Sequence, residues 1–307
     1  MGNDCTSICG FRPAAWLKIT GEDAAVFLQG QFTNDLKGPP GAVAYGLWLN
    51  QKGKVLADGH VLREAAGQFR LLSAHSPAAT IVQRLEQYVI ADDVIIEDQT
   101  HAAYGLAIWQ KQMGGEPLTT VMGELPAPGK FNQVDGSWVF RGRQSGSEHY
   151  ELIGSEAAVA EWGKRLIAAG CVKVGPEEME RARISSGIPS VPQDIGPGDL
   201  PNEAGLEQEA ISFTKGCYLG QEVMARLNNL GQVRRQLQRV RGPGLVPKTG
   251  TPLFQGEKKA GEIRTAVSSG EGFVALAMLT RLGLDEKKGF TFEPGAGPGF
   301  DAELWTN

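Results

Sequence analysis

The chain has 307 residues, of which 41% are hydrophobic and 21% charged, with a formal net charge of −5. This composition is typical of a globular protein with a sizeable core, and about 150 residues per domain predicts two domains. The negative charge argues against nucleic acid as the main partner, and no run of about 18 apolar residues predicts a membrane span. Because no apolar signal region opens the chain, we expect a cytoplasmic protein.

The N-terminal region predicts two helices and the strand between them. The first helix is expected over 22–31, where Thr20 and Asp23 resemble a capping box. A strand over 69–73 precedes the second helix, for which Ser76 is the expected N-cap and Pro77 the first residue. Its apolar stripe consists of Ile81, Val82, Leu85, Tyr88 and Val89.

A similar strand–helix unit recurs later in the chain. It comprises a strand over 150–154, Ser155 as the N-cap and Gly170 as the stop, with an apolar stripe at Val159, Trp162 and Leu166. Further strands are expected over 94–97 and 104–109. Together these elements predict an α+β fold with split β-α-β (ferredoxin-like) units on antiparallel sheets.

The chain from residue 177 onward leads to a change of character after Arg235. A short helix is expected over 177–185, and the proline- and glycine-rich stretch 188–212 is expected to form a wall of the functional site. Short strands then follow over 251–255, 261–267 and 273–279, a pattern that predicts a small antiparallel β-barrel. We therefore expect one domain over 1–240 and a second over 241–307.

Five arginines gather near the expected boundary, and they form either a solvated polar face or an anion-receiving surface: Arg226, Arg234, Arg235, Arg239 and Arg241. The four cysteines, at 5, 9, 171 and 217, do not suggest a disulfide framework. Cys5 and Cys9 are weak evidence for a metal, since no third cysteine follows at a suitable interval, and we expect no metal site.

The segment 213–222, here called the cysteine segment, places Cys217 between Lys215-Gly216 and Tyr218-Leu219-Gly220-Gln221-Glu222. A helix is expected to start near Tyr218. A thiol at a helix N-terminus beside a lysine favours the thiolate, and the two glycines let a ligand come close. The alternative is a buried structural cysteine that merely precedes a helix.

This segment closely resembles the K-G-C-Y-x-G-Q-E signature of the YgfZ-type proteins. That family is a side branch of the folate-binding fold of the glycine-cleavage aminomethyltransferase, the T-protein. Residues 19–23 with 28–35 resemble the family's "ITG…LQGQ.TND" segment, 45–54 its "Y…LN..GK" segment, and 183–189 its R-I-E-A-G-x-P segment. The resemblance runs from about residue 19 to 235.

The resemblance implies a T-protein-like folate-binding core of two interleaved α+β subdomains, followed by the C-terminal β-barrel. It also implies a folate-binding accessory protein that supports the assembly or repair of iron–sulfur enzymes, with Cys217 as the functional thiol. The implied partners are folate and iron–sulfur enzymes or their assembly machinery. Two alternatives stay open: a tetrahydrofolate-dependent aminomethyl or demethylating transferase, and a thiol redox or binding module without folate.

The site residues follow from the matching positions. Those expected to carry chemistry are Cys217, Lys215 and Asp58, the last acting near the folate nitrogens. Those expected to bind the cofactor are Gln31, Asn34, Tyr45, Asn50, Ser185, Gly216, Tyr218, Gly220, Gln221, Glu222 and Arg226.

Ser185 departs from the family pattern, which has a glutamate at this position. A carboxylate matches the adjacent amino group and ring N–H of a pterin with two charge-assisted hydrogen bonds, whereas a hydroxyl accepts from only one of them. Losing one such bond costs about 1.5–3 kcal/mol, or about tenfold to a hundredfold in affinity for tetrahydrofolate.

Overall fold

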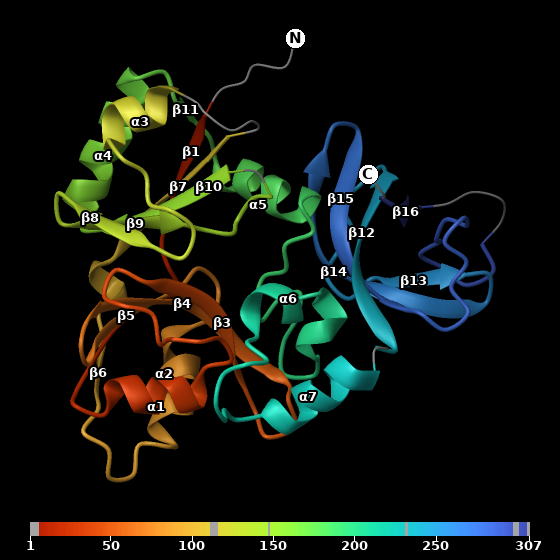
Figure 1. Ribbon diagram of the computed structural model, residues 1–307. Coiled ribbons are helices and arrows are strands. Elements are labelled where there is room, and N and C mark those ends of the chain that lie inside the picture. The colour runs from red at the N-terminus through yellow and green to blue at the C-terminus, as the bar shows by residue number, and fades with distance from the viewer. Residues whose placement is uncertain (1–5, 111–115, 147, 231–232, 297–300, 306–307) are drawn as a thin grey trace.

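Three β-sheets, each accompanied by helices, make up the fold (Figure 1). The computed structural model describes residues 6–110, 116–146, 148–230, 233–296 and 301–305. Cys5 of the C-x3-C pair lies outside these ranges. Across the described residues, no helix has both the length and the apolar character needed to span a lipid bilayer.

The first sheet is antiparallel, with strand order β3-β4-β5-β2-β6. Its strands are β2 (Ala15–Thr20), β3 (Val43–Leu49), β4 (Val55–Ala65), β5 (Gln68–Ser73) and β6 (Ile95–Asp98). Helices α1 (Ala24–Gln31) and α2 (Ala78–Glu86) pack on it and bury Leu28, Ile81 and Leu85 against strand residues. This packing follows from the apolar stripe that predicted the second helix.

The second sheet has the order β11-β1-β7-β10-β9-β8 and is antiparallel except for the β1–β11 pair. Its strands are β1 (Ser7–Phe11), β7 (Tyr104–Gln110), β8 (Phe131–Val134), β9 (Ser137–Arg141), β10 (Glu148–Gly154) and β11 (Val172–Lys173). A short 3-10 helix, η1 (Thr100–Ala102), precedes β7, and helices α3 (Glu116–Met122) and α4 (Glu156–Ala168) accompany the sheet. In α4, Ser155 is confirmed as the N-cap, and Val159, Trp162 and Leu166 are buried.

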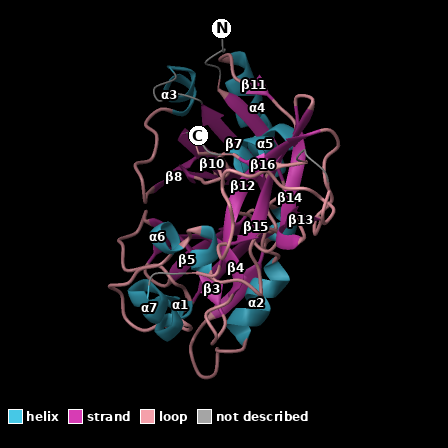
Figure 2. Ribbon diagram, turned by 90° about the vertical axis from the view of Figure 1, so that its right-hand side faces the viewer, coloured by secondary structure: helices cyan, strands magenta, loops and turns pink. Residues whose placement is uncertain are grey.

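The third sheet is antiparallel, with the order β13-β14-β15-β12-β16. Its strands are β12 (Arg235–Pro243), β13 (Pro252–Gln255), β14 (Lys258–Ser269), β15 (Gly272–Thr280) and β16 (Glu303–Leu304). The sheet curls into an open half-barrel, and Figure 2 shows its long strands beside one another. The predicted α+β fold is thus confirmed, and the predicted C-terminal β-barrel is present as an open half-barrel.

The connection between the second and third sheets holds the remaining helices of the described residues. It comprises α5 (Pro176–Ser185), η2 (Pro201–Ala204), α6 (Glu207–Ala210) and α7 (Gln221–Leu230). The stretch 188–212, whose many prolines and glycines favour loops, contains two short helical segments, η2 and α6. Helix α5 contacts β1, β14 and β15, and its Ile184 packs against Val267 and Leu276 of the third sheet.

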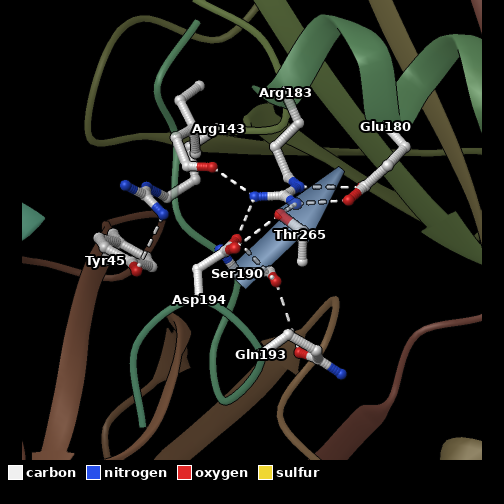
Figure 3. A network of polar contacts seen from close by, with 9 residues as sticks. Tyr45, Arg143, Glu180, Arg183, Ser190, Gln193, Asp194 and Thr265 are labelled. Carbon is white, nitrogen blue, oxygen red and sulfur yellow. Dashed lines mark hydrogen bonds and ion pairs between the residues drawn. The ribbon is translucent and has the colours of Figure 1, made fainter. Parts of the chain in front are cut away.

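A buried ionic network also joins α5 to the third sheet (Figure 3). Arg183 on α5 donates to Asp194 Oδ2 at 2.6 Å and to Thr265 Oγ1 on β14 at 3.2 Å. Thr265 in turn donates to Asp194 Oδ1 at 2.6 Å. Asp194 has no exposed surface, so its charge depends on these partners.

Three helix starts differ from the predictions. Asp23 is the N-cap of α1, but its side chain does not cap the helix and instead accepts a hydrogen bond from the backbone N–H of Asp93. The N-cap of α2 is Pro77, and the hydroxyl of Ser76, the predicted N-cap, instead donates to Asp58. Helix α7 begins at Gln221 rather than near Tyr218, which places Cys217 four residues before the helix.

The arginine cluster is partly used within the fold. Arg235 pairs with Asp199 and Glu203, Arg241 pairs with Glu303, and Arg239 donates to the carbonyl of Ser185. Arg226 and Arg234 are exposed.

Candidate functional site

A small cavity lies where the first two sheets meet the segment that follows α5. Its volume is about 20 Å³, which is room for about one water molecule. We call it the central cavity, and it is lined by Tyr45, Asp58, Gly59, His60, Leu72, Ser73, Ala74, His75, Arg143, Gln144, Glu151, Arg183, Ile188 and Pro189. The lining is rich in ionisable groups, which are uncommon in a protein interior unless they are paired or functional.

Two predicted site residues, Tyr45 on β3 and Asp58 on β4, meet in this cavity. The Tyr45 hydroxyl donates to Asp58 Oδ2 at 2.9 Å. Asp58 Oδ1 accepts from Ser76 Oγ at 2.7 Å and from Ser73 Oγ at 3.2 Å. Burial raises the pKa of Tyr45 well above its usual range, so its hydroxyl stays protonated and remains a donor.

Arg143 closes the cavity on the Tyr45 side, and sequence reasoning missed it. Its guanidinium lies 4.1 Å from the centroid of the Tyr45 ring, and its Nη1 donates to the Tyr45 hydroxyl at 3.0 Å (Figure 3). Its Nη2 forms an ion pair with Glu209, whose side chain is 50% exposed. Arg143 matches none of the family segments found in the sequence, so only the folded chain reveals it.

Two histidines and a glutamate contribute to the rest of the lining. Burial lowers the pKa of His60 and of His75, so both imidazoles are neutral at neutral pH. Burial raises the pKa of Glu151, but His149, His60 and Gln144 outweigh it and lower that pKa to about 2. The histidines are scattered in the sequence, yet the fold brings His60 and His75 to one cavity and His149 beside Glu151.

The cysteine segment lies beside the C-terminal end of α1. Lys215 is only 7% exposed, and its Nζ donates to the backbone carbonyls of Gln29, Phe32 and Asn34 at 2.8, 2.6 and 2.8 Å. Burial lowers the pKa of Lys215 to about 8. The three ammonium donors are therefore directed to one carbonyl in the last turn of α1 and to two just after it, a region where carbonyl groups lack intrahelical partners.

Cys217 is exposed, whereas Lys215 before it and Tyr218 after it are buried. Tyr218 packs in a core cluster with Leu47, Leu49 and Met224, and burial raises the pKa of Tyr218 to about 12. Lys215 and Tyr218 thus fix the chain before and after the exposed pair Gly216-Cys217. The thiol is presented at the surface by a segment that is held in place on both sides.

Gly220 allows α7 to approach the turn between β3 and β4. It has a φ of +89°, and a Cβ built on it would lie 3.0 Å from the carbonyl oxygen of Asn50. Asn50 shapes this turn, because its Oδ1 accepts from the backbone N–H groups of Lys52 and Lys54. The N–H of Gln221 donates to the carbonyl of Tyr218, and Glu222 and Arg226 are exposed on α7.

The predicted site residues therefore form two groups, connected by Asn34. The carbonyl of Asn34 accepts from Lys215, and its Nδ2 donates to the carbonyl of Tyr45 at 2.8 Å. Gln31 accepts from Arg84 at 2.9 Å. Ser185 lies at the end of α5, where its carbonyl binds Arg239, and it is not among the described residues that line the central cavity.

The described ranges contain no group of three or more His, Cys, Asp or Glu side chains that could hold a metal ion.

Comparisons with known proteins relate this chain to two kinds of relative. The family model described as "GCVT N-terminal domain" matches residues 7–110. The "tRNA-modifying protein YgfZ" of Edwardsiella ictaluri is 31% identical over 242 residues, which cover 74% of this chain and 69% of that protein. The mouse "Iron-sulfur cluster assembly factor IBA57, mitochondrial" is 29% identical over 285 residues, which cover 86% of this chain and 75% of the relative.

A solved structure shares the fold. The glycine cleavage system aminomethyltransferase T from Bartonella henselae superposes with a TM-score of 0.76 at 17% identity, covering 90% of this chain and 78% of that one. The sequence match to a YgfZ protein over most of both chains, on a T-protein fold, carries the family assignment. This chain belongs to the YgfZ family, a relative of the glycine-cleavage aminomethyltransferases.

Proposed function

We propose that this protein is a folate-binding accessory factor that supports the assembly or repair of iron–sulfur enzymes, with Cys217 as its functional thiol. The observation that carries the proposal is the exposure of Cys217 between the buried residues Lys215 and Tyr218. The naming of the mouse relative as an iron–sulfur cluster assembly factor supports the same class of function.

The position of Cys217 suits a thiol that must reach another molecule. A buried cysteine behaves as a small apolar residue, whereas an accessible one can bind a metal or exchange with another thiol. Because Lys215 is hydrogen-bonded to three carbonyls and Tyr218 is packed in a core cluster, the exposed pair between them has little freedom to retract. This arrangement leaves the sulfur available to a client protein.

The central cavity is the place proposed for the pterin end of folate. Asp58 and Tyr45 supply an acceptor and a donor there, as expected from the family resemblance. A volume of about 20 Å³ excludes any ring, so binding requires Arg143 to leave the face of Tyr45. Glu209, one of the two partners that hold Arg143, is half exposed, and ion pairs with an exposed partner are weak.

The test of the thiol is complementation in a bacterial strain that lacks its own homologue, with the activity of an iron–sulfur enzyme as the readout. We expect Cys217→Ser to abolish rescue without altering thermal stability, because the side chain is exposed. Cys171→Ala, which changes a buried cysteine, is the matched control and is expected to retain rescue. Full rescue by Cys217→Ser would exclude this account of the thiol.

The Tyr45–Asp58 pair also favours a second candidate function, tetrahydrofolate-dependent aminomethyl transfer. A carboxylate beside a folate nitrogen can hold or accept a proton during such a reaction. Calorimetric titration with tetrahydrofolate, followed by a methylene-transfer assay, separates the two functions. Tight binding without turnover supports the accessory role, whereas turnover that is lost in Asp58→Asn supports the enzyme.

A further inference from the structure

Glu151 on β10 carries a buried carboxylate that is only partly used by the fold. It is 1% exposed, and its Oε1 accepts from Gln144 Nε2 at 3.3 Å and lies 3.7 Å from His149 Nε2. Among the residues that the structure describes, none forms a hydrogen bond with its buried Oε2. A buried acceptor without a partner costs about 1–3 kcal/mol, and more for a charged group, so Oε2 is an acceptor that can gain from a donor entering the cavity.

The unpaired oxygen belongs to a residue that lines the central cavity together with Tyr45 and Asp58. The same lining includes His75, whose buried Nε2 also has no partner in the described part of the chain. A carboxylate is an acceptor only, and a neutral imidazole nitrogen can accept or donate. The matching ligand therefore offers N–H donors to the carboxylate and a further polar atom to the imidazole.

Ser185 cannot provide this carboxylate. It occupies the position of the family's glutamate, but it is a serine and lies outside the described lining of the cavity. A pterin has an amino group next to a ring N–H, a pair that a carboxylate recognises with two charge-assisted hydrogen bonds. Glu151 comes from a different element, and its carboxylate has one oxygen free and the other only weakly bonded.

We propose that Glu151 binds the amino group and the adjacent ring N–H of a bound pterin. It would thereby do what the family's glutamate, whose position Ser185 occupies in this chain, does elsewhere in the family. This inference rests on the proposed function, since it assumes that the central cavity receives folate. Arg143 must move away for the ring to enter, and Glu151 then forms part of the inner wall against which the ring is held.

Calorimetric titration with two ligands tests the proposal: tetrahydrofolate, and its analogue in which hydrogen replaces the 2-amino group. Glu151→Gln is expected to weaken tetrahydrofolate binding about tenfold to a hundredfold, the effect of losing a charge-assisted bond. It should change the affinity for the analogue much less, because that ligand lacks the amino donor. A merely structural role would weaken both ligands equally.

Glu148→Gln is the matched control. Glu148 lies on the same strand, and its carboxylate instead accepts from Arg141 and Tyr150. Since side chains alternate along a strand, it points to the opposite face from Glu151. We expect wild-type affinity for both ligands. If Glu151→Gln does not fold, Glu151→Asp, which keeps the charge but shortens the side chain, provides the same comparison.

The outcomes separate this inference from the proposed function. If the wild-type protein binds tetrahydrofolate and Glu151→Gln binds it equally well, or loses both ligands equally, the role of Glu151 is refuted while folate binding stands. An equal loss in Glu148→Gln also refutes it. If the wild-type protein does not bind tetrahydrofolate at millimolar concentration, the folate part of the proposed function fails, and this inference fails with it.

Discussion

Lys215 should be a main source of stability for the cysteine segment, and Lys215→Met tests this. The substitution keeps an unbranched chain but removes the ammonium that donates to the carbonyls of Gln29, Phe32 and Asn34. Methionine cannot donate to any of them, so the end of α1 loses its three bonds to the lysine.

The magnitude follows from the burial of these bonds. The one to Phe32 is fully buried, and the other two are partly buried. A hydrogen bond to a charged group contributes about 1.5–3 kcal/mol, and partly buried carbonyls recover some of that from water. Because one ammonium serves all three carbonyls, the contributions do not add in full. We expect a loss of about 3–5 kcal/mol in the free energy of unfolding.

Urea unfolding followed by circular dichroism measures this loss. Lys37→Met, at an exposed position, is the matched control and should change stability by less than about 0.5 kcal/mol. Lys215→Arg should also destabilise the protein, because a planar guanidinium cannot direct its donors to three converging carbonyls. A loss below about 1 kcal/mol for Lys215→Met, with function abolished, would refute the structural role and favour a chemical one.

Three further predictions follow from the same structure. Gly220→Ala should destabilise the protein by at least 1 kcal/mol in thermal unfolding, because φ is +89° and the carbonyl oxygen of Asn50 lies 3.0 Å from the new Cβ. Gly216→Ala is the control and should be nearly neutral, because its new Cβ meets nothing within 4 Å. Arg183→Met should cost about 3–5 kcal/mol in urea unfolding, because it leaves Asp194 buried with its main counter-charge removed; an unchanged midpoint would contradict this. For Glu151, whose pKa is lowered from 4.5 to about 2 by His149, His60 and Gln144, the stabilising effect of the ionised carboxylate is present above about pH 4.5 and lost as the pH falls towards 2. The difference in unfolding free energy between the wild type and Glu151→Gln should shrink over that range, and a constant difference would show the reasoning to be wrong.

Much of the fold could be predicted where apolar periodicity is strong. Helix α4 was predicted with its cap and its buried stripe, because Ser155 and the regular spacing of Val159, Trp162 and Leu166 act locally. Strand β12 was missed, because its sequence Arg-Gln-Leu-Gln-Arg-Val-Arg-Gly-Pro is mostly polar. These polar residues form a strand because β15 pairs with β12 along the whole length of β12. In addition, Arg235 and Arg241 form ion pairs with acidic side chains.

The candidate site was predictable only in part, for a related reason. Tyr45 and Asp58 lie on adjacent strands, so a local motif places them together. Arg143, in the loop between β9 and β10, and Glu151, on β10, reach the same cavity from the side of the second sheet, and nothing local in the sequence relates the two sheets. Ser76 shows the same limit. Its hydroxyl donates to Asp58 on β4, a tertiary contact that the local sequence, which predicted a helix cap, does not reveal.

The network of Arg183, Asp194 and Thr265 has a consequence for how the molecule can be divided. Thr265 belongs to the third sheet, whereas the two charged groups belong to the preceding part of the chain. A fragment ending near residue 240 would lose the Thr265 hydroxyl that both charges share, and the apolar cover of Ile184 with it. We therefore expect a fragment truncated near residue 240 to be less stable than the same residues in the full chain.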